Sequence, residues 1–470
     1  MYAQPQQLII MPLVLLLTTL FFAGTPSATH GDAAPGLHPV ILLPGYSCSQ
    51  FDARLTDDYE PPTLGCGVRK QGRGWFQLWE NYTALQQTPR SCRATRTSSG
   101  WSSIDRAAGV YRNVPGRRHP RQCPSAPPAA SDSTIPHESK LKARVHINRS
   151  CRISRYKRLK HLAVPCPLRN ACMEKLVEAL EGIGYREGAN LFGAPYDFRY
   201  TPAPPGVTAR SFSDFRSSLT RLIERASERN GDKPVILVTH SFAGFYATEF
   251  LNQSPLPWRR RYIKHFVQLS FGVGGTVLIM QVLASNMGSQ PPPPTLLGSV
   301  LAFGNRSFAS MFSLLPSPKA YGETPLVITQ ARNYSVENLE EFLAVVGFSD
   351  EDPSPVALYR TRALPSALNF KAPVVPMTAI NGVVVPTVGK VVYWDGNFTE
   401  KPQVVIGDGD GGINLETVRA LERLAGNDPD QRYFKSVLIP NTTHSGMISD
   451  DSALRTVVHE ILEAGKATST

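Results

Sequence analysis

The segment PVILVTHSFAGFYATEF, Pro234 to Phe250, constrains the fold of this chain more than any other stretch. It begins as a short apolar run, passes through Thr-His-Ser-Phe-Ala around Ser241, and continues as an amphipathic segment. A buried strand followed at once by a serine and then a helix is typical of a nucleophile elbow. Such a turn presents a serine hydroxyl at the edge of a parallel sheet, so Ser241 is the candidate nucleophile.

The usual pattern of this turn is G-x-S-x-G, and both of its glycines are replaced, by Thr239 and Ala243. Alanine adds a single methyl group and is a mild change. Threonine is β-branched and crowds a turn in which strand and helix backbones come close together. Neither residue does chemistry. The alternative interpretation is that Ser241 only ends a buried strand.

The rest of the ordered sequence alternates strand and helix patterns. Helices are expected at 173–183, 212–229 and 452–465, and strands at 234–239 and 262–269, with later apolar runs at 326–329, 403–406 and 434–439. An earlier buried strand, in HPVILLPGYSCSQFDARL, ends at Pro44-Gly45. Strands that alternate with helices predict an α/β fold built on a parallel sheet.

A serine hydrolase of this kind carries its triad in the order serine, acid, histidine along the chain. Only two histidines lie well past Ser241 with an acidic loop before them, His444 and His459. His459 sits in the middle of a helical pattern, and His265 lies on a strand that precedes every candidate acid. His444, in VLIPNTTHSGM, follows a strand directly, and we expect it to be the general base.

The candidate acid lies in QVVIGDGDGGIN, where Asp408 and Asp410 follow an apolar run among glycines that permit a tight turn. The alternating aspartates also suggest a calcium loop, but a third acidic position and a terminal glutamate are missing at the required spacing. No C-x-x-C pair suggests zinc, and the sequence predicts neither a metal site nor a cofactor.

An oxyanion hole needs two backbone N–H groups aimed at the developing negative charge. Phe242 follows the nucleophile and offers one of them. The turn LLPGYS after the first strand offers the other, most simply from Tyr46. An ordinary strand-ending turn at Pro44-Gly45 is the alternative.

The N-terminus carries an apolar run, Leu8 to Gly24, followed by small residues. Residues 1–28 are therefore predicted to be a signal peptide. Because Lys and Arg are absent before the run, an uncleaved N-terminal anchor is the alternative. Seven N-x-S/T sequons and seven cysteines fit a glycosylated, disulfide-bonded protein of the secretory pathway. We expect it to be secreted, vacuolar or ER-lumenal. The sequon asparagines are Asn81, Asn148, Asn252, Asn305, Asn333, Asn397 and Asn441.

The formal charge of +11 invites a nucleic-acid interpretation, but its location argues against one. Between Pro89 and Pro165 the chain has 17 Lys and Arg against 3 Asp and Glu, so the rest of the chain is close to neutral. The segment has little helix or strand periodicity and lacks a folded nucleic-acid reader. We expect no nucleic acid among the partners.

Six motifs, in order, resemble the lecithin–cholesterol acyltransferase family, and most closely its plant branch. They are HPVILLPGYSCSQFDARL, GAPYDFRY, HSFAG, FVQLSFGVGG, GDGDGGIN and THSGM. The resemblance covers about residues 37–88 and 172–464. It implies an α/β-hydrolase fold over 37–464, with a membrane-binding region and with a cap to which about 275–400 contribute.

By position, the resemblance assigns the nucleophile to Ser241, the acid to Asp410 rather than Asp408, and the base to His444. Tyr46 and Phe242 fall on the oxyanion turn. It also implies a disulfide between Cys66 and Cys92 and places Trp75 and Trp79 in the region that meets the lipid surface; a plain core role for these tryptophans is the alternative.

The departures from the family concentrate after Cys92, where a lid belongs. The run RRHPRQCPSAPPAASDSTIPHESK does not look like the family. We interpret 89–165 as an atypical basic insertion or as a misread lid region, such as a shifted reading frame or a misjoined exon produces.

The implied reaction is ping-pong acyl transfer through an acyl-serine. The acyl group moves from a glycerophospholipid to a sterol, another lipid alcohol or water, at a membrane or lipid surface. The alternative is a catalytically silent homologue that binds lipid.

Overall fold

The computed structural model describes residues 36–46, 48–49, 51–53, 76–79, 172–284, 309–348 and 355–466. The leader, the segment 89–165, Cys66, Cys92 and Trp75 lie outside these ranges.

The centre of the described chain is a six-stranded sheet in which every neighbouring pair is parallel. The strands, in spatial order, are β12 (Phe434–Pro440), β9 (Met377–Val383), β6 (Ile263–Leu269), β5 (Val235–His240), β1 (Val40–Leu43) and β4 (Leu191–Gly193). The predicted α/β class is therefore confirmed.

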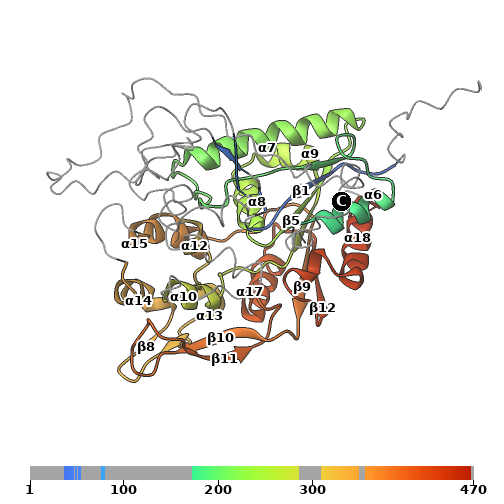
Figure 1. Cartoon of the computed structure of the whole chain (residues 1–470). Helices are drawn as coiled ribbons and strands as arrows, with labels where there is room; N and C mark the ends of the chain where they lie inside the picture. The colour runs from blue at the N-terminus through green and yellow to red at the C-terminus, as the bar shows by residue number, and fades with distance from the viewer. Residues whose placement is uncertain are drawn as a thin grey trace, which may run out of the picture.

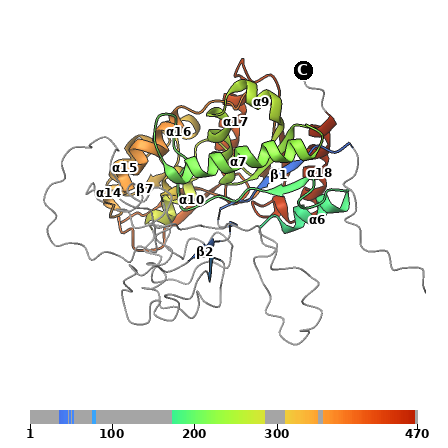
Figure 2. The same ribbon diagram turned by 90° about the horizontal axis from the view of Figure 1, so that it is seen from above.

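Helices cover both faces of this sheet because its strands are apolar on both sides. In β5, Val235 and Leu237 pack into one core and Ile236 and Val238 into another, as expected when successive side chains point to opposite faces. The first core is covered by α7 (Arg210–Arg229), α8 (Ala243–Asn252), α9 (Leu256–Tyr262) and α17 (Leu415–Gly426). The second is covered by α6 (Glu174–Gly182) and α18 (Asp451–Lys466), which lie together in Figure 2.

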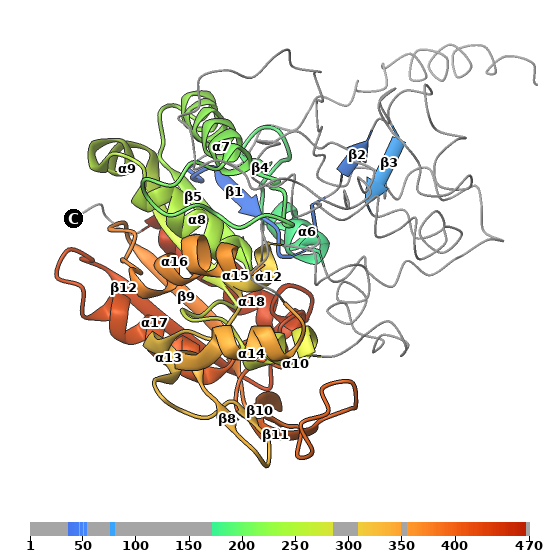
Figure 3. The same ribbon diagram turned by 90° about the vertical axis from the view of Figure 1, so that its left-hand side faces the viewer.

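A smaller four-stranded sheet lies at the far end of the molecule from α7 (Figures 1 and 3). Its order is β11 (Gln403–Gly407), β10 (Thr387–Val392), β7 (Val327–Ile328) and β8 (Asn333–Tyr334). Short helices accompany it: α10 (Val277–Ala284), α12 (Ser310–Ser313), α13 (Pro318–Tyr321), η3 (Val336–Asn338), α14 (Leu339–Val345), α15 (Pro355–Leu358), the π-helix η4 (Tyr359–Ala363) and α16 (Leu364–Leu368). The stretch of about 275–400, predicted to contribute the cap, contains all of these helices, three of the small sheet's strands and also β9 of the main sheet.

Two of the apolar runs noted in the sequence lie outside the main sheet. The runs at 326–329 and 403–406 form β7 and β11 of the small sheet, where β10 pairs with β11 in an antiparallel manner. The strand of the main sheet in this part of the chain is β9, which the sequence analysis did not identify.

A disulfide joins Cys48 to Cys172 across 124 positions of sequence and ties the segment after β1 to the start of α6. The pair was not predicted. Nearby, β2 (Phe51–Ala53) and β3 (Phe76–Trp79) form a two-stranded antiparallel sheet that contains Trp79. None of the helices in the described ranges combines the length and the apolar character that a bilayer span requires.

Candidate active site

The turn between β5 and α8 has the geometry of a nucleophile elbow. Ser241 follows the strand with φ of 57°, in the left-handed region that non-glycine residues rarely adopt. Its N–H donates to the carbonyl of Leu269, 2.9 Å away on the neighbouring strand, and its own carbonyl accepts from Gly244 at 2.9 Å. The strained backbone is therefore held from both sides.

The two residues that replace the usual glycines are both fully buried. Thr239 pairs in register with Leu43 and Gln268, so the ladder continues through it. The threonine hydroxyl has no hydrogen-bond partner among the described residues, which is the cost of a polar side chain at this position. The close approach that requires glycine falls instead at Gly244, where a Cβ would lie 2.4 Å from the Phe271 ring.

His444 lies between Ser241 and Asp410. Its Nε2 is 2.8 Å from Ser241 Oγ, and its Nδ1 is 2.9 Å from Asp410 Oδ2. With Nδ1–H donating to the carboxylate, Nε2 is left free to accept a proton from the serine. The main chain supports the same arrangement, because the N–H of His444 donates to the carbonyl of Asp410 at 2.7 Å.

The Asp410 carboxylate is almost completely buried, at 1% exposure. Its other oxygen, Oδ1, accepts the N–H groups of Gly412 at 2.9 Å and Ile413 at 2.6 Å. Burial alone would raise the pKa of Asp410, but His444 and these N–H groups outweigh it and hold the pKa below its usual value. For His444 burial lowers the pKa, while the charge and hydrogen bond of Asp410 outweigh it, so the net shift is upward.

Asp410 reaches this position at the end of a long excursion from the main sheet. The chain leaves β9, forms β10 and β11, and returns so that Asp410 makes a parallel bridge with Val385. Two hydrogen bonds close the base of the excursion, from Val385 N to Gly409 O at 3.0 Å and from Val384 N to Asp408 Oδ1 at 2.6 Å. The candidate acid thus lies at the carboxyl end of β9, beside the loop that follows β12.

The other residues weighed for the triad lie elsewhere. Asp408 accepts backbone N–H groups at the base of the excursion, from Val384 and from Gly409. His265 is buried in β6 and contacts Thr378 Oγ1 at 2.8 Å, and His459 is exposed on α18. In the part of the chain that the structure describes, no group of three or more His, Cys, Asp or Glu is placed to hold a metal ion.

The predicted oxyanion turn lies against the elbow. A Cβ on Gly45 would be 3.4 Å from the Cβ of Ser241, so the backbone before Tyr46 passes close to the serine. The rings of Tyr46 and Phe242 pack edge to face, 5.5 Å apart, and the Tyr46 hydroxyl donates to the sulfur of Met311 at 3.2 Å. The two residues predicted to donate the N–H groups are therefore neighbours.

His240 is a residue of this site that the sequence analysis did not single out. It ends β5 directly before Ser241 and is 3% exposed. Its Nε2 lies 3.0 Å from the carbonyl oxygen of His444. Its position next to the candidate nucleophile was the one available signal.

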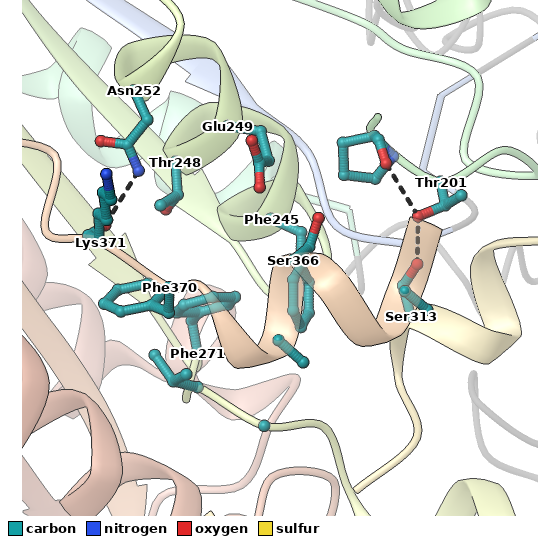
Figure 4. A pocket seen from close by; sticks show the side chains of 15 residues that line it. Thr201, Phe245, Thr248, Glu249, Asn252, Phe271, Ser313, Ser366, Phe370 and Lys371 are labelled. Carbon is teal, nitrogen blue, oxygen red and sulfur yellow. Dashed lines mark hydrogen bonds between the residues drawn. The ribbon is translucent and has the colours of Figure 1, made fainter. Parts of the chain in front are cut away.

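A pocket begins one helical turn beyond the elbow, along α8 (Figure 4). Phe245, Thr248, Glu249 and Asn252 line it from this helix, and Phe271 and Phe370 are among the side chains around it. Burial raises the pKa of Glu249, although its carboxylate accepts a hydrogen bond from Gln253 Nε2 at 3.2 Å. The Phe245 ring joins this pocket to the elbow because it packs on Phe242, with centroids 5.7 Å apart.

Comparison with known proteins gives a consistent result. The family model described as lecithin:cholesterol acyltransferase matches residues 168–370. A protein named "Lecithin-cholesterol acyltransferase-like 1" from Oryza sativa subsp. japonica is 36% identical over 435 residues, which cover 92% of this chain and 88% of that one. The "Lysosomal phospholipase A and acyltransferase" of Rattus norvegicus is 31% identical over 453 residues, 96% of this chain and 94% of that one.

Among solved structures, the crystal structure of the Tle4–Tli4 complex matches 93% of this chain and 100% of that chain, with a TM-score of 0.50 and 11% identity. At this identity the likeness concerns the fold alone. With the parallel sheet and the serine turn at its edge, the matches confirm the α/β-hydrolase fold expected from the sequence. The cap, the lid and the membrane-binding region remain predictions.

Proposed function

The chain belongs to the lecithin:cholesterol acyltransferase family, and from that premise we propose that it moves fatty acyl groups from glycerophospholipids through an acyl-serine at Ser241. It is an enzyme of the acyltransferase and phospholipase type. The observation that carries the serine mechanism is the position of His444, whose two ring nitrogens contact Ser241 Oγ and Asp410 Oδ2.

In the first half-reaction His444 Nε2 accepts the proton of Ser241 as Oγ attacks the ester carbonyl of the phospholipid. A bond forms between Oγ and the acyl carbon, and the bond from that carbon to the glycerol oxygen breaks. The lysophospholipid leaves with the proton from His444. Asp410 stabilises the imidazolium meanwhile, and its lowered pKa keeps it ionised for this purpose.

The negative charge that develops on the carbonyl oxygen rests on the N–H groups of Tyr46 and Phe242. Support comes from the close approach of Gly45 to Ser241 and from the packing of the Tyr46 and Phe242 rings. Neither N–H donates a hydrogen bond to another described residue, so both can serve a ligand.

In the second half-reaction an acceptor hydroxyl gives its proton to His444 and takes the acyl group, and Ser241 recovers its own proton. A sterol or another lipid alcohol yields a new ester, and water yields a free fatty acid. The sequence similarity to the rat protein, whose name includes both phospholipase A and acyltransferase, supports keeping both outcomes. We propose that the donor is met at a membrane or lipid surface.

We place the protein in the secretory route, secreted or in a lumen such as the ER or vacuole. The Cys48–Cys172 disulfide supports this, since such bonds persist in oxidising compartments. Three sequon asparagines, Asn333, Asn397 and Asn441, are exposed and therefore accessible to glycosylation. Asn252 is only partly exposed, and its Nδ2 donates to the carbonyl of Lys371 at 2.9 Å.

The test is labelling of the folded protein with a fluorophosphonate probe, which reacts with an activated serine. Wild type is expected to be labelled, and Ser241→Ala and His444→Ala are expected to lose the label. Ser270→Ala is the matched control. Ser270 also follows a strand and has a positive φ, of 50°, but its side chain is fully buried, so the probe should not reach it and its replacement should leave labelling intact.

A folded wild-type sample that takes no label would contradict the proposal and favour the silent, lipid-binding homologue. If labelling is lost only in Ser241→Ala and His444→Ala, vesicles of phosphatidylcholine with and without a sterol identify the acceptor. A sterol ester among the products indicates transfer, and free fatty acid alone indicates hydrolysis.

A further inference from the structure

The histidine before the candidate nucleophile has no part in the reaction as described, yet it contacts the main chain of His444 and of Gly45. His240 ends β5 and is 3% exposed. Its Nε2 lies 3.0 Å from the carbonyl oxygen of His444, which can only accept a hydrogen bond. The proton of the neutral ring is therefore on Nε2, and the ring donates to the main chain of the general base.

The opposite edge of the same ring faces the turn after β1. A Cβ on Gly45 would lie 2.6 Å from His240 Nδ1, closer than any real Cβ contact. The backbone at Gly45 thus rests directly on the imidazole, with no room for a side chain between them. The sequence analysis treated Gly45 only as a turn glycine, and the structure adds this second reason for it.

The main chain of His444 is consequently held on two sides. Its N–H donates to the carbonyl of Asp410 at 2.7 Å, and its carbonyl accepts from His240. The two imidazole rings lie 5.0 Å apart at 44°. Burial and the neighbouring His444 lower the pKa of His240 to about 3, so the ring stays neutral and does not compete for the proton that His444 handles.

We propose that His240 is a positioning residue that sets both the general base and the oxyanion turn against Ser241. This inference rests on the proposed serine mechanism and deepens it. The ring does not touch the reacting atoms. On one side the ring fixes the distance of His444 from Ser241, and on the other side it fixes the distance of Gly45 and Tyr46 from Ser241. A shift of about 1 Å in such a site can cost about 100-fold in rate.

The test compares two substitutions at 240 by the rate of hydrolysis of a soluble acyl ester and by fluorophosphonate labelling. His240→Leu removes the donor to His444, and kcat is expected to fall about 10- to 100-fold with KM changed much less. His240→Gln places an amide N–H near the position of Nε2 and is expected to recover much of the loss. This rescue separates a hydrogen-bonding role from simple filling of space.

His265→Leu and His265→Gln form the matched control. His265 is equally buried, lies on the neighbouring strand β6 and also makes one hydrogen bond through Nε2, to Thr378. Any general cost of losing a buried histidine should appear in both pairs as a lower unfolding midpoint. Only the pair at 240 should change kcat.

If His240→Leu does not fold, a second measurement tests the same contact from the side of Gly45. Gly45→Ala places a methyl group against Nδ1 and is expected to reduce labelling strongly in the wild-type background. In the His240→Ala background, where the ring is gone, the same change should cost much less.

The inference is overturned if kcat is equal in wild type and His240→Leu, or if Gly45→Ala has an equal effect in both backgrounds. The serine mechanism still stands in that case if wild type is labelled and Ser241→Ala is not. Absence of label in folded wild type would instead remove the proposed function itself.

Discussion

At the scale of single residues, the proposed mechanism makes the reactivity of Ser241 depend on the protonation of His444. Burial lowers the pKa of this imidazole, but the charge and hydrogen bond of Asp410 outweigh burial and raise it above 6.5. His444 must be neutral to accept the serine proton. Acidification through the raised pKa therefore removes the base, and activity is present above this pKa and lost below it.

We predict that the rate of labelling at Ser241 falls with decreasing pH, with a midpoint above 6.5 in the wild type. Asp410→Asn removes the influence that raises the pKa and leaves burial, which lowers it. The residual rate of this variant should be about 10³- to 10⁴-fold lower, with its midpoint shifted to lower pH. Labelling rates measured from pH 4 to pH 9 would check both effects; an unchanged midpoint in Asp410→Asn would contradict the assigned pairing.

At the scale of elements, the candidate site depends on how closely β9 approaches the loops of the acid and the base. Gly382, near the end of β9, pairs with Ile439 of β12. A Cβ at this position would lie 1.9 Å from the carbonyl oxygen of Thr442 and 3.0 Å from the Cβ of Asp410. The absence of a side chain at Gly382 therefore lets both loops settle on the same strand end.

Gly382→Ala is predicted to push the loop before His444 away from the strand. Overpacking of this kind lowers the free energy of unfolding by about 1–3 kcal/mol, and the labelling rate at Ser241 should fall as well. Gly182→Ala is the control, because its added methyl group meets no atom within 4 Å at the end of α6 and alanine favours a helix. Denaturant unfolding and probe labelling of both variants test the difference, and equal behaviour of the two would contradict this role of Gly382.

The composition of each strand explains why the β5 elbow could be predicted from the sequence and why β9 could not. The elbow was predictable because β5 begins with the unbroken apolar run VILV, Val235 to Val238, and because Ser241, Asp410 and His444 follow the order of a triad. The strand β9 was missed because Asn381 and Gly382 interrupt its pattern. Both residues are explained by tertiary contacts. Asn381 Oδ1 accepts the N–H of Phe271 at 2.8 Å, and the missing side chain at Gly382 makes room for the loops that carry Asp410 and Thr442.

The role of His240 was missed for a related reason. Its hydrogen-bond partner lies 204 positions away, and a single sequence gives no sign of which backbone carbonyl a buried histidine will meet. Ser241, Asp410 and His444 remain predictions as catalytic residues, although the structure brings their side chains together.

At the scale of the whole molecule, the Cys48–Cys172 bond closes a covalent loop across 124 positions of sequence. Seven cysteines permit many pairings, and spacing alone did not suggest this one. The bond connects the segment that follows β1 and the predicted oxyanion turn to α6, which packs on the opposite face of the sheet from α8. It therefore couples the site to the second core.

Removal of this bond is predicted to lower the free energy of unfolding by about 2–5 kcal/mol, since a long loop gains much freedom in the unfolded chain. Cys48→Ser, Cys172→Ser and the double variant should be destabilised alike, because each breaks the same bond. Thermal unfolding of the three proteins under non-reducing conditions is the measurement. A double variant clearly less stable than either single variant would mean that the cysteines contribute separately.

The excursion between β9 and Asp410 has a consequence for how such a chain can diversify. Its base is closed by the bonds of Val384 and Val385 to Asp408 and Gly409, and the N–H of Gly411 donates to Thr387 Oγ1 at the start of β10. The candidate acid is therefore held by residues at the base of the excursion and not by its exposed tip. We therefore expect that the exposed tip of the β10–β11 hairpin, residues 395–401, can be lengthened, shortened or exchanged while the proposed chemistry at Ser241 is retained. In an engineered version, this tip is the place to graft a new surface.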